Sequence, residues 1–356
     1  MERKLASIQT ILEINPIEGA DNIVVATVLG WHCVVKKGEF NVGDKIIYIE
    51  VDSILPATPE FEFMAKYNYR VKTVRLRKQI SQGLVVPISI PSWKNYRVGT
   101  DVTEALGIKK YDSEPDVEDN SPIIAKNKLD KFFLRFAWYR KFFHKKVSGK
   151  FPDYISKTDE TRIQSIPKVV EFLNINNVSI TEKLDGQSAT FFLKKSGFRK
   201  YEFGVCSRNY RIAFPNGSNY WKIAEKYDIE NVLRSMIEKN DLIVLQGEIV
   251  GEGIQGNKYK LRGLEFFAYN LVINGERINI FNRKYFDLLT ALGIMCVPYL
   301  PLPFTLPTTV DGWVELSKGV STVNVATLRE GIVVRDYNEK ISFKVISPEF
   351  LLKNGE

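Results

Sequence analysis

The alternation of apolar and polar residues divides the chain into three zones. Up to about residue 107, short apolar runs are separated by turn residues. Each run has the length and composition of a β-strand, and strands are expected at 22–29, 32–35, 45–51, 69–76 and 83–87. About five strands at this spacing in roughly 100 residues are typical of a small barrel, and the OB-fold is the leading choice. The first zone, 1–107, is therefore predicted to be an OB-like β-barrel.

The third zone, 151–356, has a mixed pattern. Longer apolar runs predict strands at 178–183, 189–193, 242–250, 266–272, 330–335 and 341–346. Helices are expected at 163–173, 221–238 and 283–292. Long strands with few helices between them favour antiparallel sheets with helices outside, so this zone is predicted to be an α+β domain.

The second zone, 108–150, is predicted to be a connector. Residues 112–119 contain five acidic residues and no apolar period, which predicts a solvated loop. Residues 126–150 contain nine Lys and Arg residues and one acid, interleaved with aromatic residues, which predicts a helix with an aromatic stripe. We expect the stripe to pack on a domain while lysines such as Lys141 and Lys145 contact phosphates. A purely solvated basic face and a membrane-surface helix are the alternatives.

Charge and composition narrow the class of protein. Fifty Lys and Arg residues against 42 Asp and Glu give a net charge of +8 and a pI near 9.1, which suits a polyanionic partner. The apolar runs are too short to span a bilayer, and no signal peptide opens the chain. Three widely spaced cysteines are expected to be reduced thiols in an intracellular protein, cytoplasmic or, in a eukaryote, nuclear. With two histidines, a His-based metal site or catalytic triad has few candidates.

Basic residues recur along the predicted strand at 69–76. Because alternate residues of a strand share a face, Arg70 and Lys72, with Arg75 and Arg77, should lie in one exposed region. OB barrels bind oligonucleotides through such strand faces. An ordinary solvated strand face explains the pattern equally well.

Lys183 stands where an apolar strand meets an Asp-Gly turn. A lysine at a strand end facing a cleft must have its charge paired or its proton removed. Nucleophilic lysines need the second condition, and desolvation and neighbouring cations lower the pKa to provide it. Taken alone, the string Lys183-Leu-Asp-Gly186 fits a surface lysine beside a hairpin turn better.

Three further apolar strands each contain one charged residue. Glu248, Glu330 and Lys344 interrupt otherwise apolar runs, and such groups are rarely buried without partners. Together the strands could bring two carboxylates and a cation to one cleft that holds phosphates and a divalent metal. A structural network of salt bridges would explain any single strand, but it explains the ordered set poorly.

Taken in order, these segments resemble the nucleotidyltransferase motifs of covalent polynucleotide ligases and capping enzymes. Within that superfamily the chain looks most like the ATP-dependent RNA ligases of the Deinococcus and Naegleria type, which place an OB domain before the ligase domain. Stretches 16–23 through 81–83, and 151–164 just ahead of Lys183, also resemble that group. The match covers most of residues 151–356, through Lys183-Leu-Asp-Gly186, Ser207-Arg-Asn209, Gly247-Glu248, Phe266-Phe-Ala-Tyr-Asn270, Glu330-Gly-Ile-Val-Val334 and Phe343-Lys344.

The resemblance implies a role for each matching residue. Lys183 would attack the α-phosphorus of ATP and carry AMP, while Lys344 and Arg208 would contact phosphate. Glu182 would lie near the adenine, and an aromatic residue, Tyr269 in preference to Phe267, would stack on it. The ribose or a catalytic Mg²⁺ or Mn²⁺ would be bound by carboxylates, namely Glu248, Glu330 and, for the metal, Asp185.

The sequence departs from the family pattern in two places and contains one misleading motif. The last motif commonly has two lysines spaced Lys-x-Lys, whereas here only Lys344 is present and Lys340 is the candidate substitute. Asn270 replaces the usual aspartate after the aromatic residue. Residues 251–256 spell GxGxxG, but no helix pattern follows, so a loop over the cleft is expected in place of a dinucleotide site.

The expected activity is sealing of breaks with 3′-OH and 5′-phosphate ends through a lysyl-AMP intermediate. The substrate would be a nicked duplex with RNA on the 3′-OH side, and we expect a monomer with no obligate protein partner. The alternatives are a GTP-using capping guanylyltransferase, a DNA ligase, and a non-catalytic RNA-binding protein in which Lys183 is structural. The first two commonly have an OB domain after the nucleotidyltransferase domain.

Overall fold

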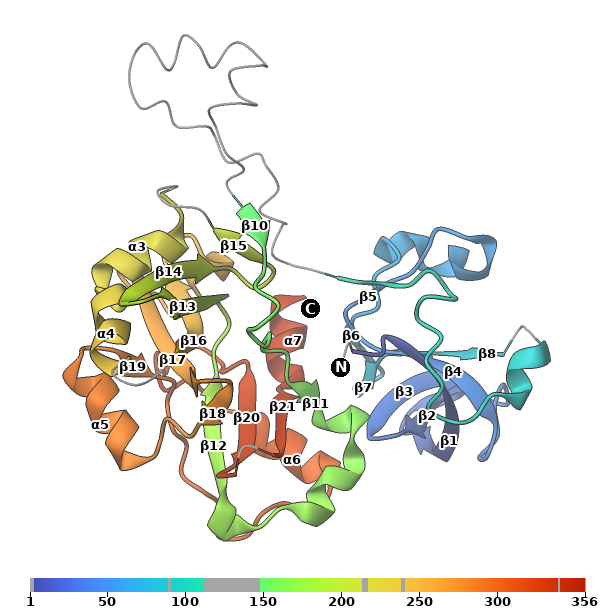
Figure 1. Cartoon of the computed structure of the whole chain (residues 1–356). Coiled ribbons are helices and arrows are strands. Elements are labelled where there is room, and N and C mark those ends of the chain that lie inside the picture. Colours follow the sequence, from blue (N-terminus) through green and yellow to red (C-terminus); the bar gives the residue numbers. More distant parts are fainter. Residues whose placement is uncertain are drawn as a thin grey trace, which may run out of the picture.

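The computed structural model has two domains, drawn in blue to cyan and in green to red in Figure 1. It describes residues 3–88, 91–111, 148–212, 217–237, 241–338 and 340–355. The predicted acidic loop and most of the basic-aromatic segment, with Lys141 and Lys145, lie outside the described residues. None of the described helices is both long and apolar enough to cross a membrane.

The smaller domain is built on a curled antiparallel sheet with the order β3-β2-β1-β4-β8. β1 is long enough to pair with β4 from Ala6 to Thr10 and with β2 from Ile11 to Ile17, and a register shift between Ile11 and Glu13 follows directly after the change of partner. A strand that changes partners at a bulge is how a sheet curls into a barrel. The strands are β1 (Ala6–Ile17), β2 (Ala20–Val28), β3 (Trp31–Lys36), β4 (Lys45–Ile49) and β8 (Leu84–Pro87).

β4 explains why this barrel has two apolar clusters. Its residues Ile46 and Tyr48 pack inside the curled sheet with Trp31, whereas Ile47 and Ile49 pack on the outer face under the remaining short elements. An unbroken apolar run is the pattern expected of a strand buried on both faces. The covering elements are β5 (Ser53–Ile54), η1 (Pro59–Tyr67), β6 (Thr73–Leu76), β7 (Gln79–Gln82), η2 (Pro91–Asn95) and β9 (Lys109–Lys110).

The larger domain contains an eight-stranded sheet whose main path is β10-β15-β14-β13-β16-β17-β18, with β19 added beside β17. Alternate residues of β16 and β17 pack under helices in the largest apolar cluster. The opposite face of the same strands is turned toward the second sheet. The strands are β10 (Ser148–Lys150), β13 (Gln187–Gly197), β14 (Lys200–Cys206), β15 (Tyr210–Ile212), β16 (Leu242–Gly251), β17 (Leu264–Ile273), β18 (Glu276–Ile278) and β19 (Met295–Cys296).

The second sheet of this domain has four strands in the order β11-β21-β20-β12. Trp313 of α6 is fully buried against it and meets Phe343 edge to face at 5.7 Å between ring centroids. The strands are β11 (Thr161–Arg162), β12 (Val178–Lys183), β20 (Gly331–Asp336) and β21 (Ser342–Ile346). The predicted fold class, an α+β domain with antiparallel sheets after an OB-like barrel, is confirmed.

Two of the three predicted helices are corrected by the structure. The segment expected to be a helix at 163–173 forms two 3-10 turns, because Pro167 cannot continue the hydrogen-bond ladder of the first turn. The predicted helix at 221–238 is two helices separated at Asp228, whose φ of 47° is left-handed. The helices and 3-10 turns are η3 (Ile163–Ser165), η4 (Pro167–Phe172), η5 (Ile175–Asn177), α3 (Asn219–Lys226), α4 (Ile229–Met236), η6 (Gln255–Asn257), α5 (Arg283–Ala291), α6 (Val310–Ser317) and α7 (Pro348–Asn354).

The chain crosses from the small sheet to the large sheet immediately after Lys183. β12 ends at Lys183, the turn Leu184–Gly186 follows, and β13 begins at Gln187. A Cβ on Gly186 would lie 2.3 Å from the backbone oxygen of Ile249, so the turn can pass this close to β16 of the large sheet only at a glycine. The crossing therefore fixes Lys183 between the sheets.

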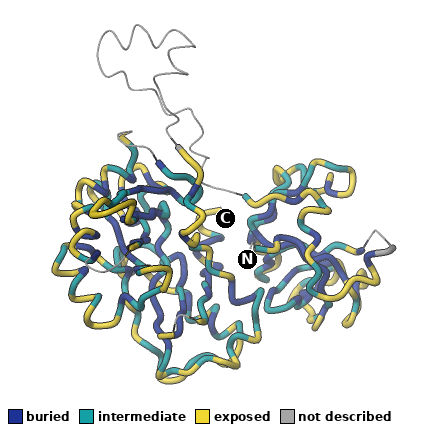
Figure 2. Tube along the Cα trace, in the orientation of Figure 1, coloured by how far each residue is buried: buried dark blue, intermediate teal, exposed yellow. Residues whose placement is uncertain are grey.

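The two domains touch through a small set of direct contacts. The backbone N–H of Gly30 donates to the carbonyl of Gln164 at 2.9 Å, and His32 pairs with Asp311 at 2.9 Å. Figure 2 shows buried chain in the sheets of both domains and exposed chain on their outer loops and helices. Backbone hydrogen bonds and ion pairs together hold the barrel against the larger domain.

Gly30 offers a test of this docking. A Cβ there would stand 3.0 Å from a methyl group of Val310 and 3.1 Å from Gln164 Cα, so Gly30→Val should force the domains apart. Overpacking of this kind costs about 1–3 kcal/mol. We expect a lower melting temperature and a larger radius of gyration in small-angle scattering. Gly197→Val, at a glycine whose Cβ would meet nothing closer than 3.8 Å, is the matched control. An unchanged radius of gyration for Gly30→Val would contradict the docking described above.

Candidate active site

A cavity of about 480 Å³ lies where the two sheets of the larger domain meet the barrel. Both domains supply charged side chains to its wall. The cations are Arg3, Arg70, Lys110, Arg162, Lys183, Arg208, Arg335 and Lys344, and the carboxylates are Asp52, Asp159, Glu160, Glu182, Asp185, Glu248 and Glu330. A polar hollow of this size with charges of both signs can hold a nucleotide and its counter-ions.

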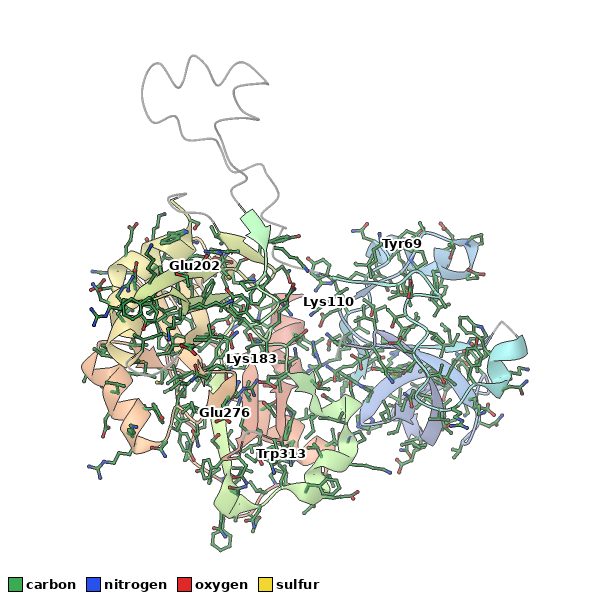
Figure 3. All side chains as sticks on the ribbon, in the orientation of Figure 1. Tyr69, Lys110, Lys183, Glu202, Glu276 and Trp313 are labelled. Carbon is green, nitrogen blue, oxygen red and sulfur yellow. The ribbon has the colours of Figure 1, made fainter. Side chains whose placement is uncertain are left out.

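Lys183 lies on this wall at the end of β12, near the middle of the larger domain (Figure 3). Its Nζ donates to Glu330 Oε2 at 2.6 Å. The pairing of β12 with β20 sets this distance, because Lys183 lies opposite Gly331, the residue after Glu330. The two residues that the sequence singled out 147 positions apart are thus direct partners.

The charge state of Lys183 differs from the sequence-based expectation. Burial lowers the pKa of Lys183, but the carboxylates of Glu330 and Glu248 raise it by more, and the net shift is upward. The expectation of a lowered pKa was wrong for this nucleotide-free form, because it assumed cations as the nearest neighbours. Here Lys183 is held as an ammonium ion by carboxylates.

Glu182 and Lys183 point in different directions because consecutive strand residues alternate. Glu182 is 1% exposed, and its Oε2 accepts a hydrogen bond from the backbone N–H of Thr322 at 2.7 Å. Its Oε1 accepts no hydrogen bond from the residues that the structure describes. A buried carboxylate oxygen without a donor is costly, and it can accept an N–H from a ligand in the cavity.

Alternation also places Glu248 and Tyr269 on the cavity side of the large sheet. Their neighbours Ile249 and Ala268 face the helices in the main apolar cluster. The ladder between β16 and β17 shifts between Gln246 and Gly247, which leaves Tyr269 as the extra residue of a bulge.

The Tyr269 hydroxyl is within 2.9 Å of both Thr158 Oγ1 and Ser188 Oγ. Burial raises the pKa of Tyr269 to about 12, so the phenol stays neutral. Phe267 is packed beside Leu184 and Val250 and is absent from the cavity wall, so Tyr269 is the aromatic residue available there.

The loop that contains the GxGxxG stretch, residues 251–256, lies against the Asp185-Gly186 turn. Lys258 forms an ion pair with Asp185, and Tyr259 accepts a hydrogen bond from the Asp185 backbone N–H at 2.7 Å. Gln255 of η6 lines the cavity. The GxGxxG stretch opens only the 3-10 turn η6, so the expected position of this loop beside the cleft is borne out.

Asp159 gathers three cations at one side of the cavity. Its Oδ1 accepts from Lys344 at 2.9 Å, and its Oδ2 accepts from Lys110 at 2.5 Å and lies 3.3 Å from Arg208. Burial lowers the pKa of Lys344 to about 8, against the raising effect of Asp159 and with the help of the nearby cations Arg3, Arg162 and Lys183.

Asp52 plays a similar part on the barrel side of the cavity. It pairs with Arg162 at 2.7 Å and lies 3.7 Å from Arg3 and 3.9 Å from Arg70. Burial raises the pKa of Asp52, but Arg162 and Arg3 together hold that pKa below its usual value. Arg162 is 5% exposed, and its Nε and Nη1 have no hydrogen-bond partner within the described parts of the chain.

Several of these residues were missed by the sequence analysis. Arg3, Lys110 and Asp159 lie in segments without a clear period, and Lys110 reaches the cavity between the domains only through the fold (Figure 3). Arg162 was inside a stretch noted for its resemblance but received no role. A charged residue beside a domain contact has no local sequence signal, because its surroundings come from distant parts of the chain.

The cations predicted to bind nucleic acid separate into two groups. Arg70 stacks on the Tyr111 ring at 3.4 Å and faces the cavity, and Lys72 donates to the carbonyl of Gly355 at 2.8 Å. Arg75 and Arg77 project into solvent from the β6–β7 hairpin. The single exposed region expected for these residues is not found, because Tyr69, with φ 55°, interrupts the predicted strand and β6 begins only at Thr73.

The remaining predictions concern the metal and the last motif. Among the described residues, no three His, Cys, Asp or Glu side chains lie close enough together to hold a metal ion. Lys340 stands in the turn held by Asp336 and is absent from the cavity wall, so it does not replace the second lysine of the motif. Asn270 is buried and donates to Gln246 at 3.0 Å. The three cysteines form no disulfide bond.

Comparison with known proteins agrees with this geometry. An OB-fold domain model matches residues 5–88, and an RNA ligase model matches residues 176–346. A comparison with curated sequences gives no match.

Among solved structures, the Naegleria gruberi RNA ligase with pyrophosphate is 32% identical, with a TM-score of 0.81 over 98% of both chains. A mutant of that ligase with AMP and Mn is 33% identical, with a TM-score of 0.80 over 99% of this chain and all of that one. Another mutant, with ATP and Mn, is 32% identical at the same TM-score and coverage. The likeness spans both domains. The chain therefore belongs to the ATP-dependent RNA ligases that have an N-terminal OB-fold domain.

Proposed function

We propose that this RNA ligase seals breaks with 3′-OH and 5′-phosphate ends by carrying AMP on Lys183. The observation that carries the proposal is the position of Lys183 on the wall of the cavity, paired with Glu330 and facing a side rich in cations. Phosphoryl transfer requires positive charge around the phosphate oxygens, and the cations of this wall supply it.

The reaction would proceed in three displacements. Lys183 Nζ attacks the α-phosphorus of ATP, so a P–N bond forms, pyrophosphate leaves and the amine releases a proton. A 5′-phosphate oxygen of the broken strand then attacks the AMP phosphorus, and the P–N bond breaks. Finally the 3′-hydroxyl attacks the activated 5′-phosphorus and expels AMP.

The proton on Lys183 is the main barrier to the first displacement. Lys183 is held as an ammonium ion, and Glu330 Oε2 is its direct hydrogen-bond acceptor at 2.6 Å. A change that draws the negative charge of Glu330 and Glu248 away from Lys183 would lower the pKa of the amine.

The chain offers ligands for a divalent metal and for the nucleotide. Glu248 and Glu330 supply the hard oxygen donors that Mg²⁺ and Mn²⁺ favour, and few protein ligands suffice because Mg²⁺ keeps several waters. The metal would neutralise these carboxylates and the phosphate oxygens, while Asp185, paired with Lys258, is the weaker candidate. Mutants of the Naegleria gruberi RNA ligase were solved with AMP and Mn and with ATP and Mn, which supports a role for a divalent metal.

The nucleotide would lie with its base toward Tyr269 and Glu182. Glu182 Oε1 is an unused buried acceptor for the adenine amino group, and Tyr269 is the aromatic side chain on the cavity wall. Lys344 and Arg208 would meet the phosphates, and Arg162 has two unused donors facing the same cavity. The adenine base and the phosphates of ATP would therefore each have partners on the cavity wall.

The physiological substrate would be a nicked duplex with RNA at the 3′-OH side. Arg75 and Arg77 are exposed cations on a hairpin whose first strand, β6, packs against α7, and Asn354 of α7 lines the cavity. A strand that leaves the cavity on this side would meet their charges. We expect Lys141 and Lys145 to add further phosphate contacts, and the protein to act as a monomer inside the cell.

The first test is the covalent adduct. Incubated with ATP and Mg²⁺ or Mn²⁺, the protein should gain the mass of one AMP, and Lys183→Ala should gain nothing because the attacking amine is absent. Intact-mass spectrometry measures this, with Lys195→Ala, at a surface lysine, as the matched control. An adduct formed only with GTP would favour a capping-type enzyme, and no adduct with either nucleotide would favour an RNA-binding protein.

The second test uses the pKa of Lys344. Because that pKa is lowered to about 8, the cation is lost as pH rises through this value, and phosphate binding should weaken with it. A lost charge-assisted hydrogen bond corresponds to roughly a tenfold change in affinity. Calorimetric titration with pyrophosphate between about pH 7 and about pH 9 should show this loss, and Lys344→Arg should flatten the profile because arginine stays charged. A flat profile in the unchanged protein would rule out a phosphate contact by Lys344.

The third test concerns the hairpin. The double variant Arg75→Ala, Arg77→Ala should lose more in nick sealing than in adduct formation, because only sealing requires the duplex. Plotted against salt concentration, its duplex affinity should have a slope shallower by roughly 1–2, as expected when one or two phosphate contacts are removed. All-RNA, all-DNA and mixed nicks define the substrate class. An unchanged slope would show that Arg75 and Arg77 do not contact the phosphates of the duplex.

A further inference from the structure

Three cations gather around the carboxylate of Asp159. Lys110 comes from β9 in the barrel domain, Arg208 from the turn after β14, and Lys344 from β21. Their nitrogens lie 2.5, 3.3 and 2.9 Å from the two oxygens of Asp159. Three elements that are far apart in the sequence thus bring positive charge to one point.

The charges at this point do not balance. Three cations surround one anion, so the cluster of four residues has a net charge of +2 when all are ionised. Burial lowers the pKa of Lys110 and the charge of Arg208 lowers it further, so two cations of the cluster repel each other. At Lys344, burial and the nearby charges of Arg3, Arg162 and Lys183 likewise oppose protonation. A phosphate carries more negative charge and more acceptor oxygens than a carboxylate, so it would satisfy these donors better.

The Asp159 carboxylate is accessible enough for another anion to replace it as the partner of these cations. Its side chain is 31% exposed, and the segment 151–160 that contains it has no helix or strand. By contrast, the neighbouring Glu160 is paired with Arg335 at 2.9 Å and its side chain is 16% exposed. The Asp159 carboxylate is therefore the less enclosed of two adjacent acids on the same wall.

We propose that Asp159 is a positioning residue which occupies, in the nucleotide-free enzyme, the place of a phosphate group. It keeps Lys110, Arg208 and Lys344 gathered and partly neutralised while the cavity contains no polyanion. When the phosphates of the nucleotide enter, the three cations exchange the Asp159 carboxylate for phosphate oxygens. This inference rests on the proposed function, because it assumes that phosphates bind on this wall.

The exchange has a measurable consequence. Asp159 competes with the phosphates for the same donors, so its removal should strengthen phosphate binding even though it removes three native contacts. A residue that merely supports the fold would have the opposite effect, because its loss would leave the cations less ordered. The direction of the change thus separates the two roles.

The experiment measures pyrophosphate binding to Asp159→Asn by calorimetric titration in the absence of divalent metal, at about pH 7. Asparagine keeps the shape but not the charge, and we expect binding tighter by on the order of tenfold, since a competing charge-assisted contact is lost. Asp153→Asn, at an exposed acid of the same segment, is the matched control and should bind as the unchanged protein does. Weaker or unchanged binding by Asp159→Asn would overturn the proposal.

Two further variants keep the result interpretable. Asp159→Glu retains the negative charge and should lack the gain in affinity, which separates the loss of charge from any other effect of a substitution at this position. In the double variant Asp159→Asn, Lys344→Met, the pyrophosphate affinity should rise much less than in Asp159→Asn alone. The reason is that the Lys344 ammonium group, which Asp159→Asn would release to the phosphate, is absent. A full gain in the double variant would also overturn the proposal.

The outcome is independent of the covalent step. If Lys183 fails to form an adduct but Asp159→Asn binds pyrophosphate more tightly, the proposed function fails while the exchange stands. If the adduct forms but Asp159→Asn binds pyrophosphate as the unchanged protein does, the exchange fails while the proposed function stands.

Discussion

The ion pair between Lys183 and Glu330 is the contact around which the rest of the cavity is arranged. It joins the end of β12 to the start of β20, and the register of the small sheet fixes its length at 2.6 Å. Because both groups are largely enclosed, removing either would leave a charge without its partner at a cost of several kcal/mol in comparable buried pairs, with a discount here for partial exposure. The sheet geometry, the charge state of the amine and access to the nucleotide therefore depend on one another.

The sequence allowed most of the strand framework and the central residues to be predicted, because strand patterns are local. Glu248 and Lys344 stood out as single charges inside apolar runs, and both line the cavity. The break at Pro167 could have been read from the residue itself, whereas the left-handed Asp228 between α3 and α4 could not. The apolar periodicity of a helix continues across both positions, so it predicted longer helices than the structure contains.

Charge state and domain contacts could not be predicted in the same way. The pKa of Lys183 depends on Glu330 and Glu248, which are near in space and distant in sequence, so local reasoning gave the wrong direction. Asp159 and Lys110 belong to segments with no period, and only the docking of the barrel makes them partners. The exposed region predicted for Arg70, Lys72, Arg75 and Arg77 is not found, because the left-handed conformation of Tyr69 interrupts the predicted strand.

The arrangement of the chain also bears on the timing of synthesis. Arg3 and Gly355 both line the cavity, so its wall contains residues from near each end of the described chain. Domains form in order from the N-terminus as a chain leaves the ribosome. The barrel can therefore fold early, but the wall of the cavity is complete only when α7 has emerged. A prematurely terminated chain would therefore lack part of this wall.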